Sequence, residues 1–220
     1  HDLDQSLVQF VPLGDPIKIS RLFLSNTSSK VRNLSLSYYV RPILGVNDQE
    51  TAMFIQSKLS DSGLLMIQNP YNVNFPGKVA FIDASIKERS ITSDRKEFLA
   101  SGDDRLPGAL TQCELSGAVG TSLDPCAVVQ VQLSLQPGEK RDIVFLLGSS
   151  ANEEEAYVLS ERYKQTKELN DAFNLVQSFW QKKLSTLTVS TPADTINIML
   201  DGWLPYQVIA CRLWARSGFY

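Results

Sequence analysis

Histidine, cysteine and long apolar runs are scarce in this chain of 220 residues, and each shortage excludes a class of chemistry. The single histidine is His1. A Ser-His-Asp or Cys-His catalytic site would have to use this terminal residue, and a metal cluster built from histidines is excluded. The three cysteines, Cys113, Cys126 and Cys211, lack CxxC or zinc-like spacing. Their odd number predicts reduced, buried cysteines of a cytoplasmic protein rather than a disulfide framework.

An excess of basic charge is also absent. Lysine and arginine together number 21 against 24 for aspartate and glutamate, which gives a formal net charge of -3 and a pI near 5.3. We therefore expect no nucleic-acid partner and no attraction to an anionic membrane. No apolar run approaches the roughly 18 residues that a membrane span needs. A hydrophobic content of 43% instead predicts one large or two small globular domains.

Alternating apolar and polar residues predict strands in the first two thirds of the chain. The alternation is regular in VRNLSLSYYVRPIL, which places Leu34, Leu36, Tyr38 and Val40 on one face. Further strands are predicted at residues 6–13, 17–26, 63–69, 78–85, 126–135 and 141–149. Because no helices intervene, these strands predict an antiparallel β-sandwich.

Two polar stretches separate the predicted strands. Residues 25–30 (SNTSSK) read as a hairpin turn. Residues 92–124 form a long excursion without an obvious pattern. A connection of this length is usually a functional or packing loop.

Helical spacing begins near residue 149. Residues 149–166 have a serine or asparagine as helix cap, a triple glutamate in the first turn and basic residues late, as the helix dipole favours. Residues 167–187 continue at helical spacing. Thr191 to Asp194 (TPAD) predicts the start of a third helix, which Pro205 should bend or restart. This last helix is apolar on most sides, as in the interior of a large helical layer. We therefore expect both ends of the chain to be cut, and the last helix to belong to a domain that is largely absent.

Several motifs carry a resemblance to a known family. They are FVPLGDPIKISRLFLSN, KVRNLSLSYYVRPILG, NPYNVNFPGKVAF, SDRKEFL, LSGAVGTSLDPCAVVQ and MLDGWLPYQVIACRLWARSGFY. The chain resembles glycoside hydrolase family 94 through nearly its whole length. That family holds cellobiose-type and β-1,2-oligoglucan phosphorylases and the C-terminal phosphorylase domain of cyclic β-1,2-glucan synthases, and the likeness is greatest to the last type.

The resemblance implies an α+β chain that is part of a larger enzyme. Members have a β-supersandwich, a helical linker and an (α/α)6 barrel that carries the active site. Residues 1–149 would be the β-sandwich portion without its N-terminal strands, residues 150–190 the helical linker, and residues 191–220 the truncated first helix of the barrel. The earlier strands would precede His1, and most of the barrel would follow Tyr220.

The resemblance also implies the chemistry of the parent enzyme. An aspartate general acid protonates the leaving glycosidic oxygen while inorganic phosphate, the co-substrate, attacks the anomeric carbon. One carboxylate suffices because phosphate is itself a nucleophile. The general acid would lie beyond Tyr220, so we expect no catalytic residue, no metal and no cofactor in this segment, which should be inactive alone.

Gln207 and Arg212 are the candidate substrate-binding residues, since both lie in the family-like segment of the last helix. Each could instead bond neighbouring barrel helices. Trp203, Tyr206 and Trp214 are either platforms for sugar rings or barrel core.

Two other features admit a site or a structural reading. Asp94 and Glu97 are either paired carboxylates or a helix cap and a surface charge. The glycines of LSGAVGTSLDPC (residues 115–126) could approach a phosphate. The loop lacks the lysine and the strand–loop–helix order of a phosphate cradle, which favours a packing loop.

The sequence thus predicts a non-catalytic scaffold segment of a carbohydrate-active enzyme that phosphorolyses or transfers β-linked glucans. Its predicted partners are a β-glucan oligosaccharide in the parent enzyme, the missing barrel of the same chain and a second copy in a homodimer. The expected location is cytoplasmic, either in a free enzyme or in part of an inner-membrane multidomain protein. The alternative is a free-standing carbohydrate-binding or dimerisation β-sandwich module, which would not need an apolar helix at its end.

Overall fold

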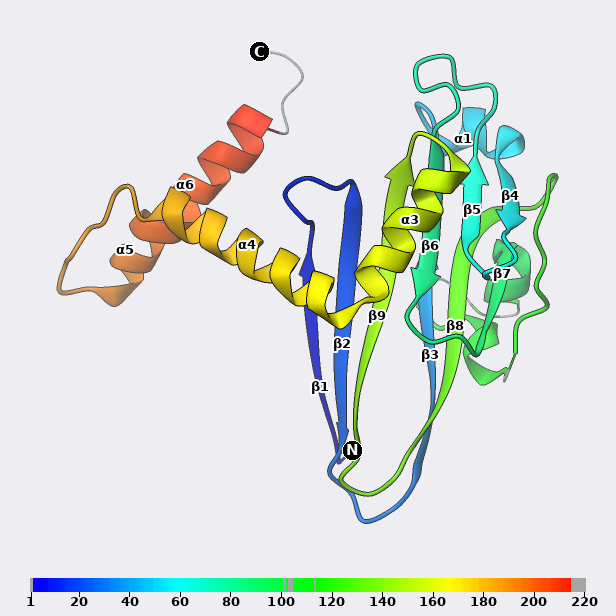
Figure 1. Cartoon of the computed structure of the whole chain (residues 1–220), viewed down its shortest axis with the longest axis horizontal. Coiled ribbons are helices and arrows are strands. Elements are labelled where there is room, and N and C mark those ends of the chain that lie inside the picture. The colour runs from blue at the N-terminus through cyan, green and yellow to red at the C-terminus, as the bar shows by residue number, and fades with distance from the viewer. Residues whose placement is uncertain (1, 101, 103–104, 113, 215–220) are drawn as a thin grey trace. The chain divides into compact units, whose positions relative to one another are not determined.

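The computed structural model describes residues 2–100, 102, 105–112 and 114–214, and for residues 212–214 the backbone alone. The contacts divide the chain into two units, residues 1–170 and residues 171–220, and each is described by itself. The first unit contains antiparallel sheets with added helices, and the second is helical (Figure 1). The chain therefore has the predicted α+β class.

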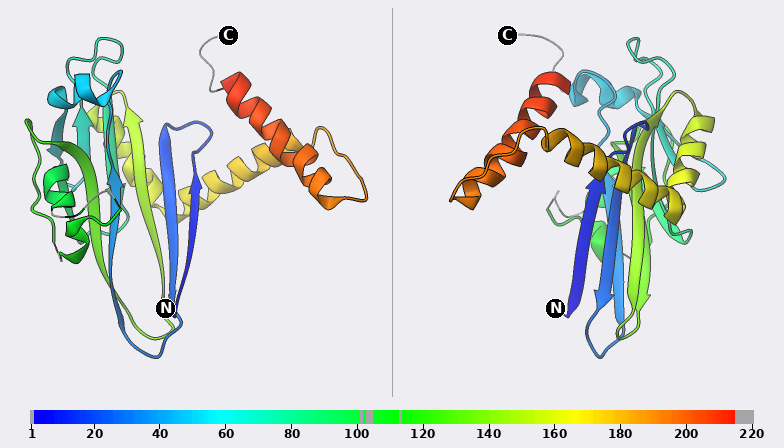
Figure 2. Two further views of the ribbon diagram at one scale, coloured as in Figure 1. Left: turned by 180° about the vertical axis from the view of Figure 1, so that it is seen from behind. Right: turned by 60° about the vertical axis from the view of Figure 1, so that its left-hand side comes forward.

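The first unit is built on two antiparallel sheets (Figure 1, Figure 2). The six-stranded sheet has the order β1-β2-β9-β6-β5-β4, and the three-stranded sheet has the order β3-β8-β7. The strands of the first sheet are β1 (Leu3–Phe10), β2 (Ile17–Asn26), β4 (Gln56–Leu59), β5 (Leu65–Gln68), β6 (Val79–Ala84) and β9 (Lys140–Ser150). Those of the second are β3 (Arg32–Val40), β7 (Arg89–Asp94) and β8 (Pro125–Leu135).

The main core lies between the two sheets, as the alternation in β3 predicts. Successive strand residues point to opposite faces, so the apolar face of β3 turns toward the other sheet. Tyr38 stacks on Phe145 of β9 with ring centroids 5.3 Å apart. Buried residues of both sheets complete this core: Leu24, Leu65, Ile67, Ile82, Ile143, Ile91, Val129, Val131 and Leu135.

Residues 25–30 do not form the predicted hairpin. β2 pairs with β1 and β9, whereas β3 pairs with β8 in the other sheet, so this connection crosses between sheets. Asn26 fixes the crossing. It is fully buried, and its Nδ2 donates to the carbonyls of Lys30 (2.8 Å), Leu135 (3.0 Å) and Gln136 (3.1 Å). Local composition marks a turn here, but it cannot tell which sheet the next strand joins.

The long predicted loop contains regular structure. Its first residues form the end of β7, and α2 (Arg95–Leu99) and the short helix η2 (Gly108–Thr111) follow. Phe98, Ala109, Leu115, Cys126 and Val128 form a second buried cluster, with Phe98 stacked on Tyr39 at 5.0 Å. Of the two alternatives for this segment, a functional loop or a packing loop, the buried cluster supports packing. The sequence analysis also missed β4, α1 (Asp48–Thr51) and η1 (Ala52–Phe54).

Helices α3 (Glu153–Lys164) and α4 (Thr166–Leu184) follow the last strand, as predicted. Asn152 caps α3 by accepting a hydrogen bond from the amide of Glu155 at 2.8 Å. α3 packs on β6 and β9 (Figure 2). It covers the face of the six-stranded sheet opposite the main core. Phe81 and Asp83 of β6 point to this face, because they alternate along the strand with the core residue Ile82.

In the second unit, the helical segment after residue 193 changes type three times, at Met199, Leu204 and Val208. The order is α5 (Asp194–Ile198), the π-helix η3 (Met199–Trp203), α6 (Leu204–Gln207) and the π-helix η4 (Val208–Trp214). Pro205 stands in the first turn of α6, in accord with the expected restart. The TPAD pattern suggests Thr191 as the cap and Pro192 as the first helical residue, which is wrong: α5 begins at Asp194 after Ala193, which provides no side-chain cap.

The cysteines differ from the expectation. Cys126 is free and buried, as predicted, whereas Cys211 is exposed. Cys113 lies outside the described residues. Among the residues that are described, no helix is long and apolar enough to cross a membrane.

Candidate functional site

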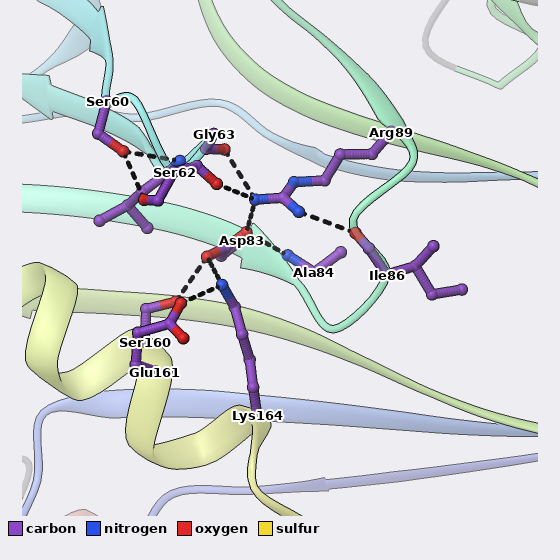
Figure 3. Close-up of polar contacts among 11 residues, drawn as sticks. Ser60, Ser62, Gly63, Asp83, Ala84, Ile86, Arg89, Ser160, Glu161 and Lys164 are labelled. Carbon is purple, nitrogen blue, oxygen red and sulfur yellow. Dashed lines mark hydrogen bonds and ion pairs between the residues drawn. The ribbon is translucent and has the colours of Figure 1, made fainter.

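An ion network in the first unit is centred on Asp83 of β6 (Figure 3). The side chain is fully buried, and both of its oxygens are engaged. Oδ1 accepts from Arg89 Nη2 at 2.6 Å and from the Ala84 amide at 2.8 Å. Oδ2 accepts from Lys164 Nζ at 2.7 Å and from Ser160 Oγ at 2.6 Å. With four donors on one carboxylate, Asp83 acts as a joint between strands and helix.

Arg89 extends the network to the turn between β4 and β5 and to the turn between β6 and β7. Its Nη1 donates to the carbonyl of Ile86 at 2.8 Å, and Nη2 donates to the carbonyls of Ser62 (3.2 Å) and Gly63 (3.0 Å). Gly63 has φ +80°, and a Cβ added there would lie 3.0 Å from Arg89 Nη2. Glycine at this turn therefore meets both a backbone and a space requirement.

Lys164 brings the end of α3 into the same network. Its side chain is 15% exposed, and Nζ also contacts Glu161 Oε1 at 2.7 Å. A buried carboxylate with two cations and saturated hydrogen bonds is costly to break, since removing one partner leaves uncompensated charge. The network can fix the position of α3 on the sandwich. It leaves no free carboxylate oxygen for acid–base chemistry.

A second joint links α3 to the loop before β2. Asp15 Oδ2 accepts from Arg162 Nη1 at 2.8 Å and from the Tyr163 hydroxyl at 2.5 Å. Burial, together with the hydrogen bond to the Asp15 carboxylate, raises the pKa of Tyr163 to about 12. The neutral phenol is the form that donates to Asp15, so this joint is intact over the whole neutral range.

A third joint involves the first turns of α4. Arg21 of β2 donates to both carboxylate oxygens of Asp142, with the shortest distance 2.5 Å, and to Asn170 Oδ1 at 2.7 Å. Its guanidinium also lies over the ring of Phe23 at 4.8 Å. These three clusters all join the sandwich to residues 160–170 of the helices that follow it.

Gln207 is placed in α6 of the second unit with its side chain exposed, and Arg212 lies in η4 with its side chain outside the described residues. Tyr206 contacts Trp180 and Trp203 with ring centroids 5.0 Å and 6.2 Å apart. Trp203 is 52% exposed and Tyr206 is 41% exposed. The side chain of Trp214 is also outside the described residues.

The acidic pair and the glycine loop have structural roles. Asp94 caps α2 by accepting from the Lys96 amide at 3.0 Å, which confirms the capping interpretation. Glu97 is half-buried and is bonded within the fold: it accepts from Thr92 Oγ1 and from the Ser116 amide (2.7 Å) and hydroxyl (2.8 Å). Burial opposes ionisation of Glu97, but these hydrogen bonds outweigh it, so its pKa is lowered.

The loop of residues 115–126 packs against strands. The Gly117 amide donates to the carbonyl of Ile91 at 2.9 Å, and the Gly120 amide donates to Ser57 Oγ at 2.9 Å. The two glycine amides are therefore committed within the fold rather than directed to a phosphate. Within the described part of the chain, no group of three or more His, Cys, Asp or Glu side chains could hold a metal ion.

The sequence analysis missed the Asp83 network, although one signal was visible. Asp83 is a lone carboxylate inside the otherwise apolar strand VAFIDA. A charge at such a position requires a partner. Lys164 is not identifiable as a partner from sequence, because α3 lies far along the chain, and Arg89 is one of several nearby charged residues.

Comparison with known proteins places this architecture in a class. A family model described as the supersandwich domain of glycosyl hydrolase 94 matches residues 1–166, and one described as the catalytic domain of the glycosyl hydrolase 94 superfamily matches residues 179–220. The chain therefore consists of a supersandwich domain followed by the start of a catalytic domain. It belongs to glycoside hydrolase family 94.

Individual relatives are much longer than this chain. The cyclic beta-(1,2)-glucan synthase NdvB of Rhizobium meliloti (strain 1021) is 32% identical over 208 residues, which are 93% of this chain and 7% of that protein. The N,N'-diacetylchitobiose phosphorylase of Vibrio proteolyticus is 25% identical over 217 residues, 96% of this chain and 27% of that protein. The 3-O-beta-D-glucopyranosyl-beta-D-glucuronide phosphorylase of Paenibacillus borealis is 24% identical, with 29% of its length covered. The chain thus spans less than a third of each relative.

Proposed function

We propose that the chain is the scaffold segment of an enzyme that phosphorolyses or transfers β-linked glucans, of the cyclic β-1,2-glucan synthase or β-glucan phosphorylase type. The observation that carries the scaffold role is the buried network around Asp83, which holds α3 against the sandwich. A rigid joint at this place lets the sandwich position whatever follows the helices. The names of the relatives, a glucan synthase and several phosphorylases, support the substrate class and inorganic phosphate as co-substrate of the parent enzyme.

In this proposal residues 1–149 are the sandwich portion, residues 150–190 the linker and residues 191–220 the first barrel helix. The main partner is the catalytic barrel of the same polypeptide. The second unit supports this role, since Ile198 is 68% exposed and Val208 is 53% exposed on its last helices. Apolar side chains exposed in this way are suited to packing against further protein.

Gln207 and Arg212 remain our candidates for sugar contact in the parent enzyme. The exposed amide of Gln207 supports this, because it can both donate to and accept from sugar hydroxyls. In the complete enzyme, Gln207→Ala should raise KM for the glucan while the melting temperature stays unchanged. A fall in stability with unchanged KM would instead mean that Gln207 bonds neighbouring helices.

Phosphate-dependent turnover tests the proposed function. The complete enzyme should release glucose 1-phosphate from a linear β-linked glucan when inorganic phosphate is added, and the isolated 220-residue chain should release none. Turnover by the isolated chain would refute the scaffold assignment. A complete enzyme without phosphate-dependent release or glucan transfer would refute the parent activity.

The proposed homodimer is tested by sedimentation of the complete enzyme over a range of concentrations. A mass twice that of one chain supports it, and a single-chain mass throughout counts against it.

A further inference from the structure

The first unit has a hollow that none of the joints above uses. It has a volume of about 730 Å³ and lies between residues 43–54 and residues 69–80. Its apolar lining includes Ile43, Val46, Phe54, Tyr71 and Phe75. Ligand pockets of proteins typically have volumes of about 300–1,000 Å³ and combine mostly apolar walls with a few polar groups. In size and lining this hollow matches a binding site for a small or chain-like ligand.

Aromatic rings dominate the accessible part of the hollow. Tyr71 is 69% exposed and Phe75 is 63% exposed, and Tyr71 rests on Phe54 with ring centroids 4.9 Å apart. Val46 and Val73 beside them are exposed by more than four fifths. The negative face of an aromatic ring attracts polarised C–H groups, and a pyranose ring presents such groups on its flat faces. The rings therefore fit a ligand with apolar faces and polar edges.

The two walls are fixed to each other before any ligand arrives. Nδ2 of both Asn69 and Asn72 donates to the carbonyl of Leu44, at 2.7 Å and 3.2 Å. Asn69 Oδ1 accepts from the Tyr71 amide at 3.0 Å, and Asn72 Oδ1 accepts from the Asn74 amide at 3.0 Å. A loop held in this way loses less conformational entropy on binding, so weak contacts suffice for measurable affinity.

The polar groups of the hollow favour an uncharged ligand. Glu50 and Lys78 both line it, so the two formal charges cancel. In the described part of the chain, the ammonium of Lys78 and the side-chain amide of Asn74 have no hydrogen-bond partner in the protein, and both side chains are exposed. They can donate to hydroxyl groups, and the Glu50 carboxylate can accept from them.

We propose that this hollow binds a short stretch of β-linked glucan, with Tyr71 and Phe75 against the faces of glucosyl rings. The ligand class rests on the proposed function, whereas the position and the chemistry rest on the hollow itself. The site would hold a glucan chain on the sandwich. It would raise the local concentration of substrate or keep a growing product attached.

Calorimetric titration of linear β-1,2-glucotetraose into the 220-residue chain tests the proposal. We expect saturable binding that Tyr71→Ala and Phe75→Ala each weaken by about 10-fold or more, as for the loss of a ring contact together with its buried area. Tyr71→Phe should bind as the parent chain does, because it keeps the ring. Tyr157→Ala is the matched control: this tyrosine is 47% exposed on α3 and does not line the hollow.

Each other outcome overturns the proposal. Absence of binding, with the chain folded by circular dichroism, removes the site but leaves the parent activity intact if the complete enzyme still releases glucose 1-phosphate. Binding that Tyr71→Ala and Phe75→Ala leave unchanged places the sugar elsewhere. A dimer that these two variants convert to monomer in sedimentation, without sugar binding, means that a second protein surface occupies the hollow.

Discussion

Replacing Asp83 by asparagine keeps the shape of the side chain and removes one buried negative charge. The cations that remain are poorly placed to find water, since the side chain of Arg89 is 5% exposed and that of Lys164 is 15% exposed. Breaking a buried ion pair by removing one partner costs about 3–5 kcal/mol. For a chain of this size, about 2–4 °C of melting temperature is lost per kcal/mol, so we expect Asp83→Asn to melt about 6–20 °C lower.

The readout must report on the first unit. Trp180, Trp203 and Trp214 all lie in residues 171–220, so tryptophan fluorescence follows the second unit. Amide hydrogen exchange of strand peptides from residues 3–150, recorded by mass spectrometry during urea unfolding, follows the sandwich. Comparing the two signals also shows whether loosening α3 separates the unfolding of the two units.

The matched control is Lys58→Met. Lys58 Nζ contacts Glu153 Oε2 at 2.7 Å and also links the six-stranded sheet to α3, but the two side chains are 64% and 46% exposed. An exposed pair is worth about 0–1 kcal/mol, so this variant should melt close to the parent chain. Adding Lys164→Met to Asp83→Asn should restore part of the lost stability, because it removes one stranded cation.

Equal, small losses for Asp83→Asn and Lys58→Met would refute this reasoning. They would mean that the side chains around Asp83 rearrange to admit water at little cost.

Three further predictions concern titration and reactivity. The pKa of Tyr163 is raised from 10.0 to about 12 in the folded protein. Its contribution to the free energy of unfolding is therefore fully present below pH 10 and is lost as the pH rises toward 12. When the pH is raised from neutral to strongly alkaline, the free energy of unfolding in urea should therefore fall less for Tyr163→Phe than for the parent. An equal fall for both proteins would contradict this. The pKa of Glu97 is lowered in the folded protein. Its contribution to the free energy of unfolding is therefore present above the ordinary pKa of a glutamate and is lost as the pH falls through the lowered pKa. Glu97→Gln should be less stable than the parent at neutral pH, and the gap should close in acid; a constant gap would assign the loss to packing. Burial, with nearby carboxylates, raises the pKa of the Cys126 thiol to about 12. Alkylation of the folded chain followed by peptide mapping should mark Cys211 and spare Cys126, whereas rapid labelling of Cys126 would indicate local opening.

Local patterns in the sequence reveal the strands but not their partners. The face of β3 that carries Tyr38 was predictable because alternation is a local property of a half-buried strand. The crossing at residues 25–30 was not predictable, because turn composition is the same whether the next strand joins the same sheet or the opposite one. β7 was missed for a related reason: its end (TSD) is polar, although Thr92 and Ser93 are buried.

In the candidate sites, too, local features were predictable from the sequence and long-range contacts were not. The cap formed by Asp94 follows from its position one residue before a short helix, and it was anticipated. The Asp83 network depends on a contact between β6 and α3, and the hollow at Tyr71 depends on two loops brought together by Asn69 and Asn72. Such long-range contacts leave no spacing rule in the chain.

The buried position of Asn26 has a consequence for how the protein can be produced. Asn26-Thr27-Ser28 fits the acceptor pattern for N-linked glycosylation, and that reaction modifies the same Nδ2 atom that donates to three backbone carbonyls here. Glycan attachment takes place on the newly made chain, before the crossing between the sheets closes. A sugar on Asn26 would then occupy the corner where β2, β3 and β8 meet, and the two sheets could not close over their core. Expression through a eukaryotic secretory route should therefore yield misfolded, glycosylated chain, whereas the same sequence made without glycosylation should fold.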